Sequence, residues 1–511
     1  MQFLRSSRAT LTGTLALLGV LSVAGCAAGP DFARPVPPSA TRYTAESLRG
    51  EGASADDQHQ HLALGQNIEG AWWTLFRSDA IDRLVAQAVE HNRTLTASMA
   101  TLAQAQELAM ARAGSRYPQV DLTGGAGRQQ YGKEFLGPIG IAPFTYFAVG
   151  PTVSYALDYT GGVARSVEQQ YALAEVERHQ LDAAYLTVTG QAVMQSLTIA
   201  SVRAQIATIE TILAQDRDNL RLVQTAFDSG SVAREDVVSA QSQIANDMTL
   251  LPPLRQELAK ARHALSVVLG RAPARELPDG MDLAQITLPL QVPVSLPSEL
   301  AHRRPDILAA EARLHAATSA VGVAQSNLYP KIQLTASVGQ QSLKADQLFD
   351  RASSAWSIVA GFTAPIFDGG TLRAEKRAAI DAMHSSAATY EQTVLEAFAQ
   401  VADLLEGLDH DAEQLDAQDH AQQAAQSSLE LARISYQEGN AGVLLVLDAE
   451  RSYQQARLGY VRALAQRYLD TVQLFLALGG TSPSAPLGAA LSQLPPDHES
   501  AQPRRGPPHV L

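Results

Sequence analysis

Three segments of the chain alternate apolar and polar positions with the two-residue period of a β-strand. From Phe147 to Tyr159, large apolar residues stand at every second position, with small or polar residues between them. Ile332 to Val338 repeats this alternation, and Trp356 to Phe367 shows it less cleanly. A half-buried strand of a soluble sheet and a strand with one face toward lipid share this pattern. The pattern therefore predicts strands and leaves open what covers their apolar face.

Two other segments have the composition and spacing of long helices. Gly190 is the only helix breaker from Val163 to Phe227, and Gly407 is the only one from Thr371 to Glu438. Each segment would form ~100 Å of helix at 1.5 Å per residue. Apolar residues recur three or four positions apart, which favours packing against another helix. The sequence therefore predicts long helices of the coiled-coil type.

Shorter helices are expected to return antiparallel to the long ones. They should cover roughly 235–269 and 443–478, and each follows a glycine turn. Pro252-Pro253 should break or kink the first of them, because proline lacks the N–H that a helix interior needs.

The same order of elements occurs twice along the chain. Tyr117 to Thr123 returns as Tyr329 to Thr335, about 210 positions later, and flanking segments match at nearly the same offset. This period is too long for a solenoid and indicates a duplicated, domain-sized unit. We expect the copies at 71–290 and 291–480, each ordered as helix, strand pair, long helix, glycine turn and helix.

The N-terminus has the features of a secretory signal. Two arginines precede an apolar run from Leu15 to Val23, which is too short to span a bilayer. The chain's only cysteine, Cys26, follows directly after Val23-Ala24-Gly25, and this word resembles a bacterial lipobox. We therefore expect residues 1–25 to be a signal peptide and Cys26 to carry a diacylglycerol. The alternative is a chance cysteine beside an ordinary signal peptide.

The residues after the cysteine indicate where the protein goes. In lipoproteins of this type an Asp after the cysteine would suggest inner-membrane retention, and here that residue is Ala27. Residues 26–70 are thus expected to form a lipidated N-terminal segment at the outer membrane. Residues 481–511 are rich in Pro and Ser and are expected to be disordered.

Charge and hydropathy narrow the function classes. The formal net charge of −13 argues against a nucleic-acid partner, which favours a basic surface. After the signal peptide no run of about 18 consecutive apolar residues occurs, so a spanning part must be a β-barrel. Two strand pairs cannot close a barrel and would leave edges exposed in lipid. A spanning subunit must therefore oligomerise.

Three sequence motifs resemble those of a known family. They are Gly29-Pro30-Asp31-Phe32 with Arg34-Pro35, Arg303-Arg304-Pro305-Asp306-Ile307, and Pro365-Ile366-Phe367-Asp368-Gly369-Gly370. With the duplication, they resemble the TolC-like outer-membrane factor family, in particular the lipoprotein branch of resistance-nodulation-division efflux systems. The resemblance implies a mixed α/β membrane protein. It would be a trimeric 12-stranded outer-membrane β-barrel continued by a long periplasmic α-helical barrel.

The resemblance also assigns roles to the two glycine turns. Gly230 and Gly439 would mark the tips where a periplasmic adaptor docks. The periplasmic gate would consist of Leu444, Asp448, Glu235 and Asp236. Some relatives carry a gate-locking arginine where this chain has Ala441, so an apolar ring at Leu444 would do more of the closing. The alternative explains both glycines as ordinary helix C-caps before a new helix.

Motifs for catalysis and metal binding are missing from the sequence. It has no His-Glu-x-x-His, no Walker loop and no Gly-x-Ser-x-Gly, so we expect no enzyme and no catalytic residue. Gly124 to Gly127 lies inside an expected strand and opens no helix. His59 and His61 could hold a metal only weakly, and a solvated segment is the preferred interpretation. The stretch from His410 to His420 is expected to be an exposed helix face, and no cofactor is expected beyond the lipid on Cys26.

These observations predict a passive exit duct for small molecules such as drugs. It would work as a homotrimer with a periplasmic adaptor and an inner-membrane efflux transporter. Two alternatives remain open, namely the outer-membrane duct of a type I protein secretion system and a non-porous periplasmic coiled-coil scaffold.

Overall fold

The computed structural model describes residues 28–36, 40, 42–45, 60–68, 71–132, 142–274 and 281–480. Cys26, the expected signal peptide and the tail from 481 lie outside these residues, as does His59. The chain forms two compact units, and each unit takes segments from both halves of the sequence. Unit 1 comprises 1–38, 96–181 and 305–397, and unit 2 comprises 39–95, 182–304 and 398–511.

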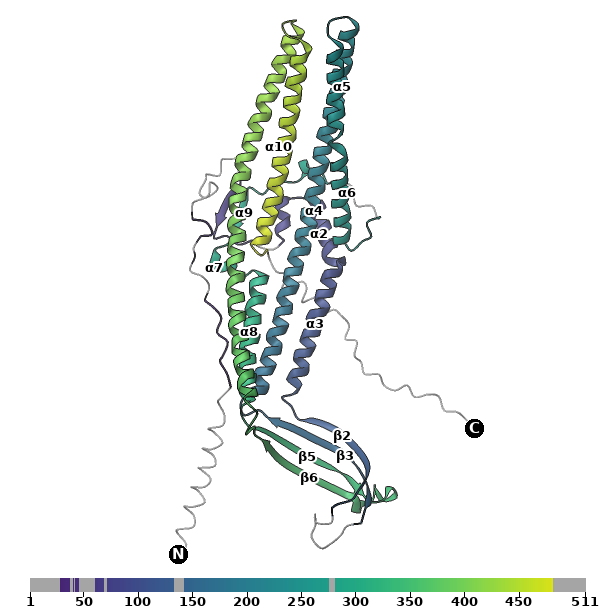
Figure 1. Ribbon diagram of the computed structural model, residues 1–511, viewed down its shortest axis with the longest axis vertical. Coiled ribbons are helices and arrows are strands. Elements are labelled where there is room, and N and C mark those ends of the chain that lie inside the picture. Colours follow the sequence, from purple (N-terminus) through teal and green to yellow (C-terminus); the bar gives the residue numbers. More distant parts are fainter. Residues whose placement is uncertain are drawn as a thin grey trace, which may run out of the picture. The chain divides into compact units, whose positions relative to one another are not determined.

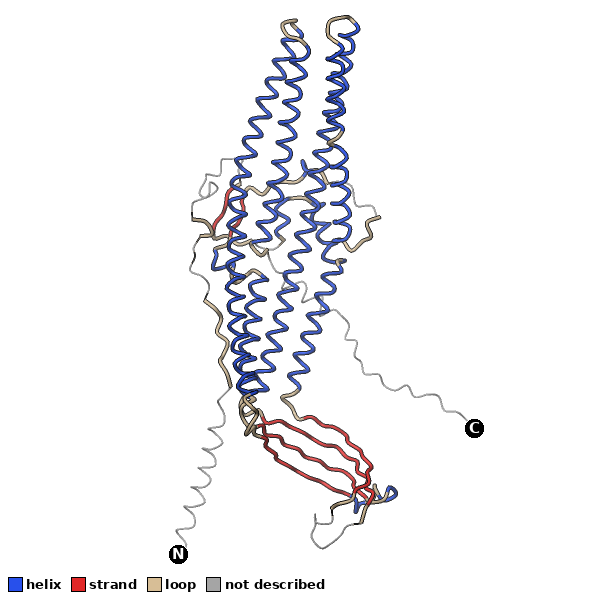
Figure 2. The backbone as a smooth tube through the Cα atoms, in the orientation of Figure 1, coloured by secondary structure: helices blue, strands red, loops and turns tan. Residues whose placement is uncertain are grey.

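Unit 1 contains a four-stranded antiparallel sheet (Figure 2). Its strands are β2 (Gln119–Gln129), β3 (Phe144–Leu157), β5 (Lys331–Ser342) and β6 (Ser354–Thr363), in the order β2-β3-β5-β6. Within the described chain, β2 and β6 each pair with one neighbour only, so both are edge strands. Two short helices, η3 (Ala345–Gln347) and η4 (Arg351–Ser353), link β5 to β6.

The strand register gathers the apolar residues of all four strands on one face. Val153 pairs with Ala336, which pairs with Ile358, so the alternations of β3, β5 and β6 are in phase. This register also resolves the facing of β6, whose alternation is the least clean in the sequence. The strand ends at Thr363 and not at Phe367 as expected, because Pro365 has no N–H for the ladder. The opposite face carries small and polar residues.

The turns from strand to helix in unit 1 are built in the same way twice. Gly161 precedes α4 (Gly162–Asp228) with φ +75°, and Gly369-Gly370 precede α9 (Thr371–Gln437) with φ +64° and +89°. A carboxylate caps each helix. Asp158 Oδ2 accepts from the backbone N–H of Ala164 at 2.7 Å, and Asp368 accepts from two N–H groups at the start of α9. These N–H bonds hold the pKa of Asp368 below its usual range.

Two shorter helices complete unit 1, α3 (Arg93–Gly114), whose first residues belong to unit 2, and α8 (Pro305–Ser326). Helix α8 begins at Pro305, as Arg304-Pro305-Asp306 predicts.

The N-terminal segment of unit 1 is fixed on α4. The backbone N–H of Ala28 donates to Thr160 O at 2.8 Å. Arg165 forms an ion pair with Asp31 and another with Glu168 at 2.8 Å. The motif Gly29-Pro30-Asp31-Phe32 therefore has a packing role within unit 1.

Helix α8 holds the same segment from the other side. Phe32 stacks on His315 with ring centroids 4.4 Å apart, and Arg34 Nε donates to Glu311 at 2.7 Å. A Cβ on Gly29 would lie 2.4 Å from Gly322 Cα, so this contact requires two glycines.

Unit 2 has its core where three aromatic side chains meet. Trp72 and Phe76 of η1 (Trp72–Phe76) pack on Phe475 and are almost fully buried. Helix α2 (Asp79–His91) contacts η1, and η2 (Leu283–Gln285) and α7 (Pro297–Leu300) also belong to unit 2.

A two-stranded parallel sheet joins β1 (His61–Leu64) to β4 (Gln291–Val294) in unit 2. The expectation of a solvated segment at His61 is wrong, because this residue pairs in β1 and its ring nitrogens are buried.

Two helical hairpins form the rest of unit 2 (Figure 1). Hairpin one comprises α4 from residue 182, α5 (Arg234–Met248) and α6 (Leu251–Val268). Hairpin two comprises α9 from residue 398 and α10 (Val443–Ala477). The break between α5 and α6 at residues 249–250 confirms the interruption expected from Pro252-Pro253.

By length and hydropathy, one described helix, α4, could cross a membrane, although half of its most apolar stretch is buried within the structure. A buried core helix has the same composition, so this observation alone does not show that α4 crosses a membrane.

Candidate functional site

The two hairpin turns have the same backbone geometry. Gly230 has φ +75°, its N–H donates to Phe227 O, and the next N–H, of Ser231, donates to Ala226 O, both at 2.8 Å. Gly439 has the same φ and the same pair of bonds. This is the Schellman motif, in which a glycine in the left-handed region ends a helix. The C-cap interpretation of both glycines is confirmed, and adaptor docking at these turns needs its own test.

The two acids after the first turn lie at the N-terminus of α5. Asp236 Oδ2 accepts from the backbone N–H of Ala233 at 3.0 Å, and the Asp236 N–H donates to Ala233 O at 3.1 Å. Glu235 beside it is exposed. Both carboxylates suit the positive end of the helix dipole, so they stabilise the start of α5 whatever else they do.

The two expected gate residues of hairpin two lie in the first turns of α10. The Leu444 side chain is 52% exposed, and so is that of Leu445. Asp448 is exposed and forms an ion pair with Arg451 on the same helix. A cation was expected only at position 441, which is alanine, whereas the cation in the structure is Arg451, one helical turn after Asp448.

Leu444 and Asp448 line a pocket of about 320 Å³ between hairpin one and α10. Its walls come from α4, α5 and α10, and the lining residues are Asp216, Asn219, Ser239, Ala240, Gln243, Leu444, Leu447, Asp448 and Arg451. Glu235 and Asp236 do not belong to this lining. The structure therefore brings Leu444 and Asp448 together with Ser239 and Gln243 of α5.

An apolar cluster joins the two hairpins near their turns. Val223 of α4, Val237 of α5 and Val443 of α10 are buried against one another. Leu447, which also lines the pocket, packs against this cluster. The start of α10 is thus held on hairpin one by burial of apolar surface.

One wall of the pocket contains a buried acid that the sequence analysis missed. Asp216 is only 7% exposed, and its Oδ2 has no hydrogen-bond donor among the described residues. Burial, and after it the neighbouring Asp247 and Glu450, raise the pKa of Asp216 to about 7 against the lowering effect of a hydrogen bond with Gln454. Glu450 is itself buried and accepts from Arg433 at 3.2 Å.

A second acid of this kind lies in hairpin two. Burial and the nearby Asp470 raise the pKa of Asp411 to about 7, while Arg467 and His410 lower it. The expected exposed face from His410 to His420 therefore needs a correction. His410 and His420 are exposed, but Asp411 Oδ2 is buried without a described donor.

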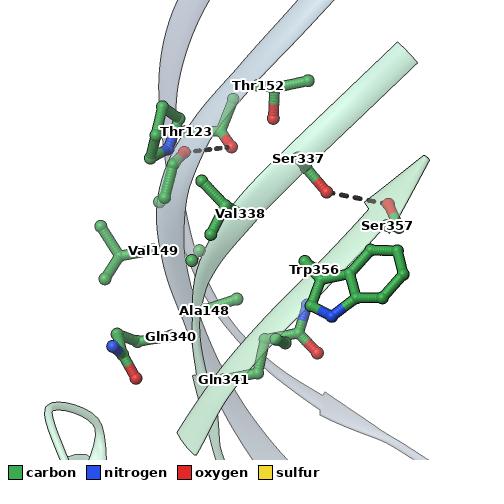
Figure 3. A pocket seen from close by; sticks show the side chains of 16 residues that line it. Thr123, Ala148, Val149, Thr152, Ser337, Val338, Gln340, Gln341, Trp356 and Ser357 are labelled. Atoms are coloured by element: carbon green, nitrogen blue, oxygen red, sulfur yellow. Dashed lines mark hydrogen bonds between the residues drawn. The ribbon is translucent and has the colours of Figure 1, made fainter.

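The polar face of the sheet forms a second candidate surface (Figure 3). A hollow of about 510 Å³ lies over β2, β3, β5 and β6, with Thr123, Thr152, Ser337 and Ser357 among the residues that line it. Ser337 and Ser357 share a hydrogen bond of 2.9 Å. No charged residue lines the hollow, and its lining combines hydroxyl groups, amides and glycines with Val149, Val338 and Trp356.

Two glycines shape this hollow. A Cβ on Gly150 would lie 2.3 Å from Val338 O, and one on Gly339 would lie 2.5 Å from Val149 O. The ladder between β3 and β5 skips these glycines and Pro151. The two backbones therefore approach more closely there than any residue with a Cβ allows.

Within the described residues, no group of three or more His, Cys, Asp or Glu side chains is placed to hold a metal ion.

The fold combines a sheet with one apolar face, a strand-to-helix turn that occurs twice, and two long hairpins. This combination is typical of a class of outer-membrane channel proteins. The sequence profile of the outer membrane efflux protein family matches residues 84–271 and 296–480. The chain belongs to this family, which confirms the resemblance and the prediction of an outer-membrane efflux channel.

Individual relatives match over almost their whole length. The solvent efflux pump outer membrane protein SrpC of Pseudomonas putida is 28% identical over 473 residues, which is 91% of this chain and 98% of that protein. The cation efflux system protein CusC of Escherichia coli K12 is 28% identical over 466 residues, or 90% and 97% of the two chains. The solved structure of the outer-membrane channel OprN has 27% identity and a TM-score of 0.78, covering 89% of this chain and 99% of that one.

Proposed function

We propose that this protein is the exit duct of a tripartite efflux pump and that it spans the outer membrane as a homotrimer. The observation that carries the proposal is the sheet of unit 1. One of its faces is apolar, the other is small and polar, and both edge strands lack a second neighbour in the described chain. Trp356, Ile358 and Phe362 of β6 are each at least 75% exposed on the apolar face. An apolar face of this size and two open edges suit lipid and further copies of the chain.

Three copies would close a 12-stranded barrel, an even number within the range of such barrels. The apolar face would meet lipid and the hollow of the polar face would line the lumen. The long helices α4 and α9 would continue the barrel as a periplasmic helical tube. Heat-modifiable, SDS-resistant trimers in outer-membrane fractions are the expected result. Soluble monomers would instead support the alternative of a non-porous scaffold.

The lipid on Cys26 would anchor each subunit at the membrane surface. Ala28, two residues later, is bonded to Thr160 beside the strand-to-helix turn at Gly161. Metabolic labelling with palmitate should mark the parent and leave Cys26→Ser unlabelled. Labelling of the variant would contradict the anchor.

The pocket beside the hairpin turns would serve as the periplasmic gate. Leu444 and Asp448 would form the constriction, Glu235 and Asp236 would contribute charge at the neighbouring tip, and the turns at Gly230 and Gly439 would dock the adaptor. A ring of Asp448 carboxylates would favour cations. Asp448→Ala should loosen the closed state, because it removes a carboxylate from the expected constriction. Unchanged single-channel conductance and unchanged uptake of bulky antibiotics would contradict this assignment.

The duct would perform no chemistry, hold no cofactor besides the lipid and bind no nucleic acid. Its partners would be a periplasmic adaptor and an inner-membrane transporter that supplies the energy. Crosslinking in living cells, purification and mass spectrometry would identify them. A resistance-nodulation-division transporter with its adaptor is the expected result. An ATP-binding transporter would instead assign the chain to type I protein secretion.

A further inference from the structure

Each helical hairpin contains a pair of aspartates between its two antiparallel helices. In hairpin one, Asp216 of α4 lies against Asp247 of α5. In hairpin two, Asp411 of α9 lies against Asp470 of α10. Both pairs lie in helices of unit 2, whereas the strands that would meet the membrane belong to unit 1.

The aspartate after the turn is held in the same way in both pairs. Gln243 Nε2 donates to Asp247 Oδ2 at 2.8 Å, and Gln466 Nε2 donates to Asp470 Oδ2 at 2.9 Å. In both cases the glutamine precedes the aspartate by one helical turn. Gln473 Nε2 also donates to Asp470 Oδ1 at 3.3 Å, so each of these carboxylates is held by at least one amide donor.

In both pairs, the aspartate before the turn has one carboxylate oxygen without such a donor, although Gln454 also bonds to Asp216. Oδ2 of Asp216 and Oδ2 of Asp411 are buried, and no described group donates to either atom. Two ionised carboxylates in contact away from water repel each other strongly. One proton between them changes this repulsion into a short O–H···O⁻ hydrogen bond. Each pair is thus built to hold a single proton.

The charges around the two pairs differ. Glu450 of α10 adds a third negative charge beside Asp216, and the guanidinium of Arg433 from α9 is bound to Glu450. The ion pair of Asp448 with Arg451 lies on the far wall of the pocket. Nothing among these groups supplies Asp216 with a positive partner of its own.

In hairpin two, cations do face the pair. Arg467 of α10 is buried beside Asp411 and donates to Gln60 at 2.8 Å, and His410 lies next to Asp411 in the chain. Asp416 of α9 acts on the same Arg467. These cations lower the pKa of Asp411 but leave it at about 7, as for Asp216, so both hairpins should respond over the same pH range.

We propose that the two aspartate pairs are proton-operated clasps, each of which joins the helices of its hairpin while the shared proton is bound and loosens them when it leaves. The clasp itself does not depend on the duct function. Its effect on the periplasmic gate rests on that proposed function, because Asp216 lines the pocket that holds Leu444 and Asp448.

The direction of the pH effect follows from the raised pKa. The folded hairpin binds the proton more tightly than the open one, in which an aspartate has its ordinary pKa of 3.8. The stability of each hairpin is therefore highest in acid, falls as the pH rises from about 4 to about 7, and is constant above that. Between pH 6 and pH 8 the opening equilibrium constant should rise about tenfold.

Hydrogen exchange followed by mass spectrometry on the full-length protein in detergent would test this inference. Opening constants, corrected for the intrinsic exchange rate at each pH, are measured for peptides from α5 and from the middle of α10. The parent should show the tenfold rise in α5. Asp216→Asn keeps the shape and supplies a permanent donor to Asp247, so it should remove the rise in hairpin one only. Asp411→Asn should do the same in hairpin two only.

Two further variants serve as a replacement and as a control. Asp247→Asn removes the same repulsion from the other side, so it replaces Asp216→Asn if that variant folds poorly. Glu257→Gln changes an exposed carboxylate of α6 and should leave the pH response of the parent unchanged. A parent without pH response, or a response that survives in both asparagine variants of hairpin one, would overturn the proposal.

Single-channel recording separates the clasp from the duct. The closed channel should open more often at pH 8 than at pH 6 in the parent, and equally often at both in Asp216→Asn. If the exchange data show the clasp and no channel is recorded, the clasp stands and the duct function fails.

Discussion

The two helical hairpins follow one plan and differ in the residues that complete it. Both end a long helix at a glycine with φ +75° and turn through the same two hydrogen bonds. After the turn, hairpin one returns as two helices that break at residues 249–250, whereas α10 of hairpin two continues for 35 residues. The backbone of the turn is therefore fixed by one glycine, while the residues after it decide what each tip presents.

The tips differ most in polarity. Hairpin one continues with Glu235 and Asp236, which stabilise the start of α5, and hairpin two continues with the half-exposed Leu444 and Leu445. The aspartate pairs also differ in position. Asp216 lies ~20 Å of helix before its glycine and Asp411 ~40 Å before its own, at 1.5 Å per residue. The two hairpins thus share one backbone plan but make different side-chain contacts.

The substitution with the largest expected effect should destabilise hairpin two and leave hairpin one unchanged. Leu429 of α9 is buried against Val446 of α10, in a cluster that belongs to hairpin two alone. Leu429→Ala should cost ~2–5 kcal/mol through lost burial and a residual cavity. Local hydrogen exchange should rise in α9 and α10 and stay unchanged in α5. Leu429→Met conserves volume and should cost less than ~1.5 kcal/mol. Equal effects of both variants would contradict the packing described here.

A second substitution should affect both hairpins at once. Val223 of α4 is fully buried in the cluster that also contains Val237 and Val443. Val223→Ala removes two buried methyl groups and should cost about 2 kcal/mol. Exchange should increase in α5 and at the start of α10 together. A change confined to hairpin one would show that the two tips are not coupled through this cluster.

The turn glycines should be equivalent. Gly230→Val and Gly439→Val place a β-branched residue at φ +75° and should each cost ~1–2 kcal/mol. The melting temperatures of the two variants, followed by circular dichroism, should fall by similar amounts. Asparagine tolerates this backbone region better, so the melting temperatures of Gly230→Asn and Gly439→Asn should fall less. A drop at only one turn would contradict the shared geometry.

The smallest effect concerns the break in hairpin one. Replacing Pro252 and Pro253 by alanine restores two N–H donors for the carbonyls of Met248 and Thr249. The pair of substitutions should join α5 to α6 and make hairpin one resemble hairpin two. Stability should change by less than ~1 kcal/mol, because helix propensity is a weak term beside packing. Increased amide protection at residues 249–254 is the expected readout, and unchanged protection would mean that packing alone sets the break.

Part of the functional site could be predicted from the sequence, and part could not. Gly230, Gly439, Leu444 and Asp448 stand at turns that a pattern of long helices and glycines reveals. Asp216 and Asp411 gave no comparable signal, because a single acid on a polar-looking helix face is the usual mark of exposure. The glutamine one turn before Asp247 and before Asp470 is the only repeated cue, and it acquires meaning once the opposing helix is known.

Local residue patterns predicted the main helices and strands of this protein and their order. Alternation in β3 and β5, the start of α8 at Pro305, the two glycine turns and the break at Pro252-Pro253 are all local, since each depends on a few neighbouring residues and their backbone preferences. Tertiary structure decided the rest.

The pairing of β1 with β4, the contact of Arg165 with Asp31 and the meeting of Asp216 with Asp247 join segments that local patterns do not connect. Their positions depend on how whole helices and strands pack, because burial and opposing charge act through space and not along the chain.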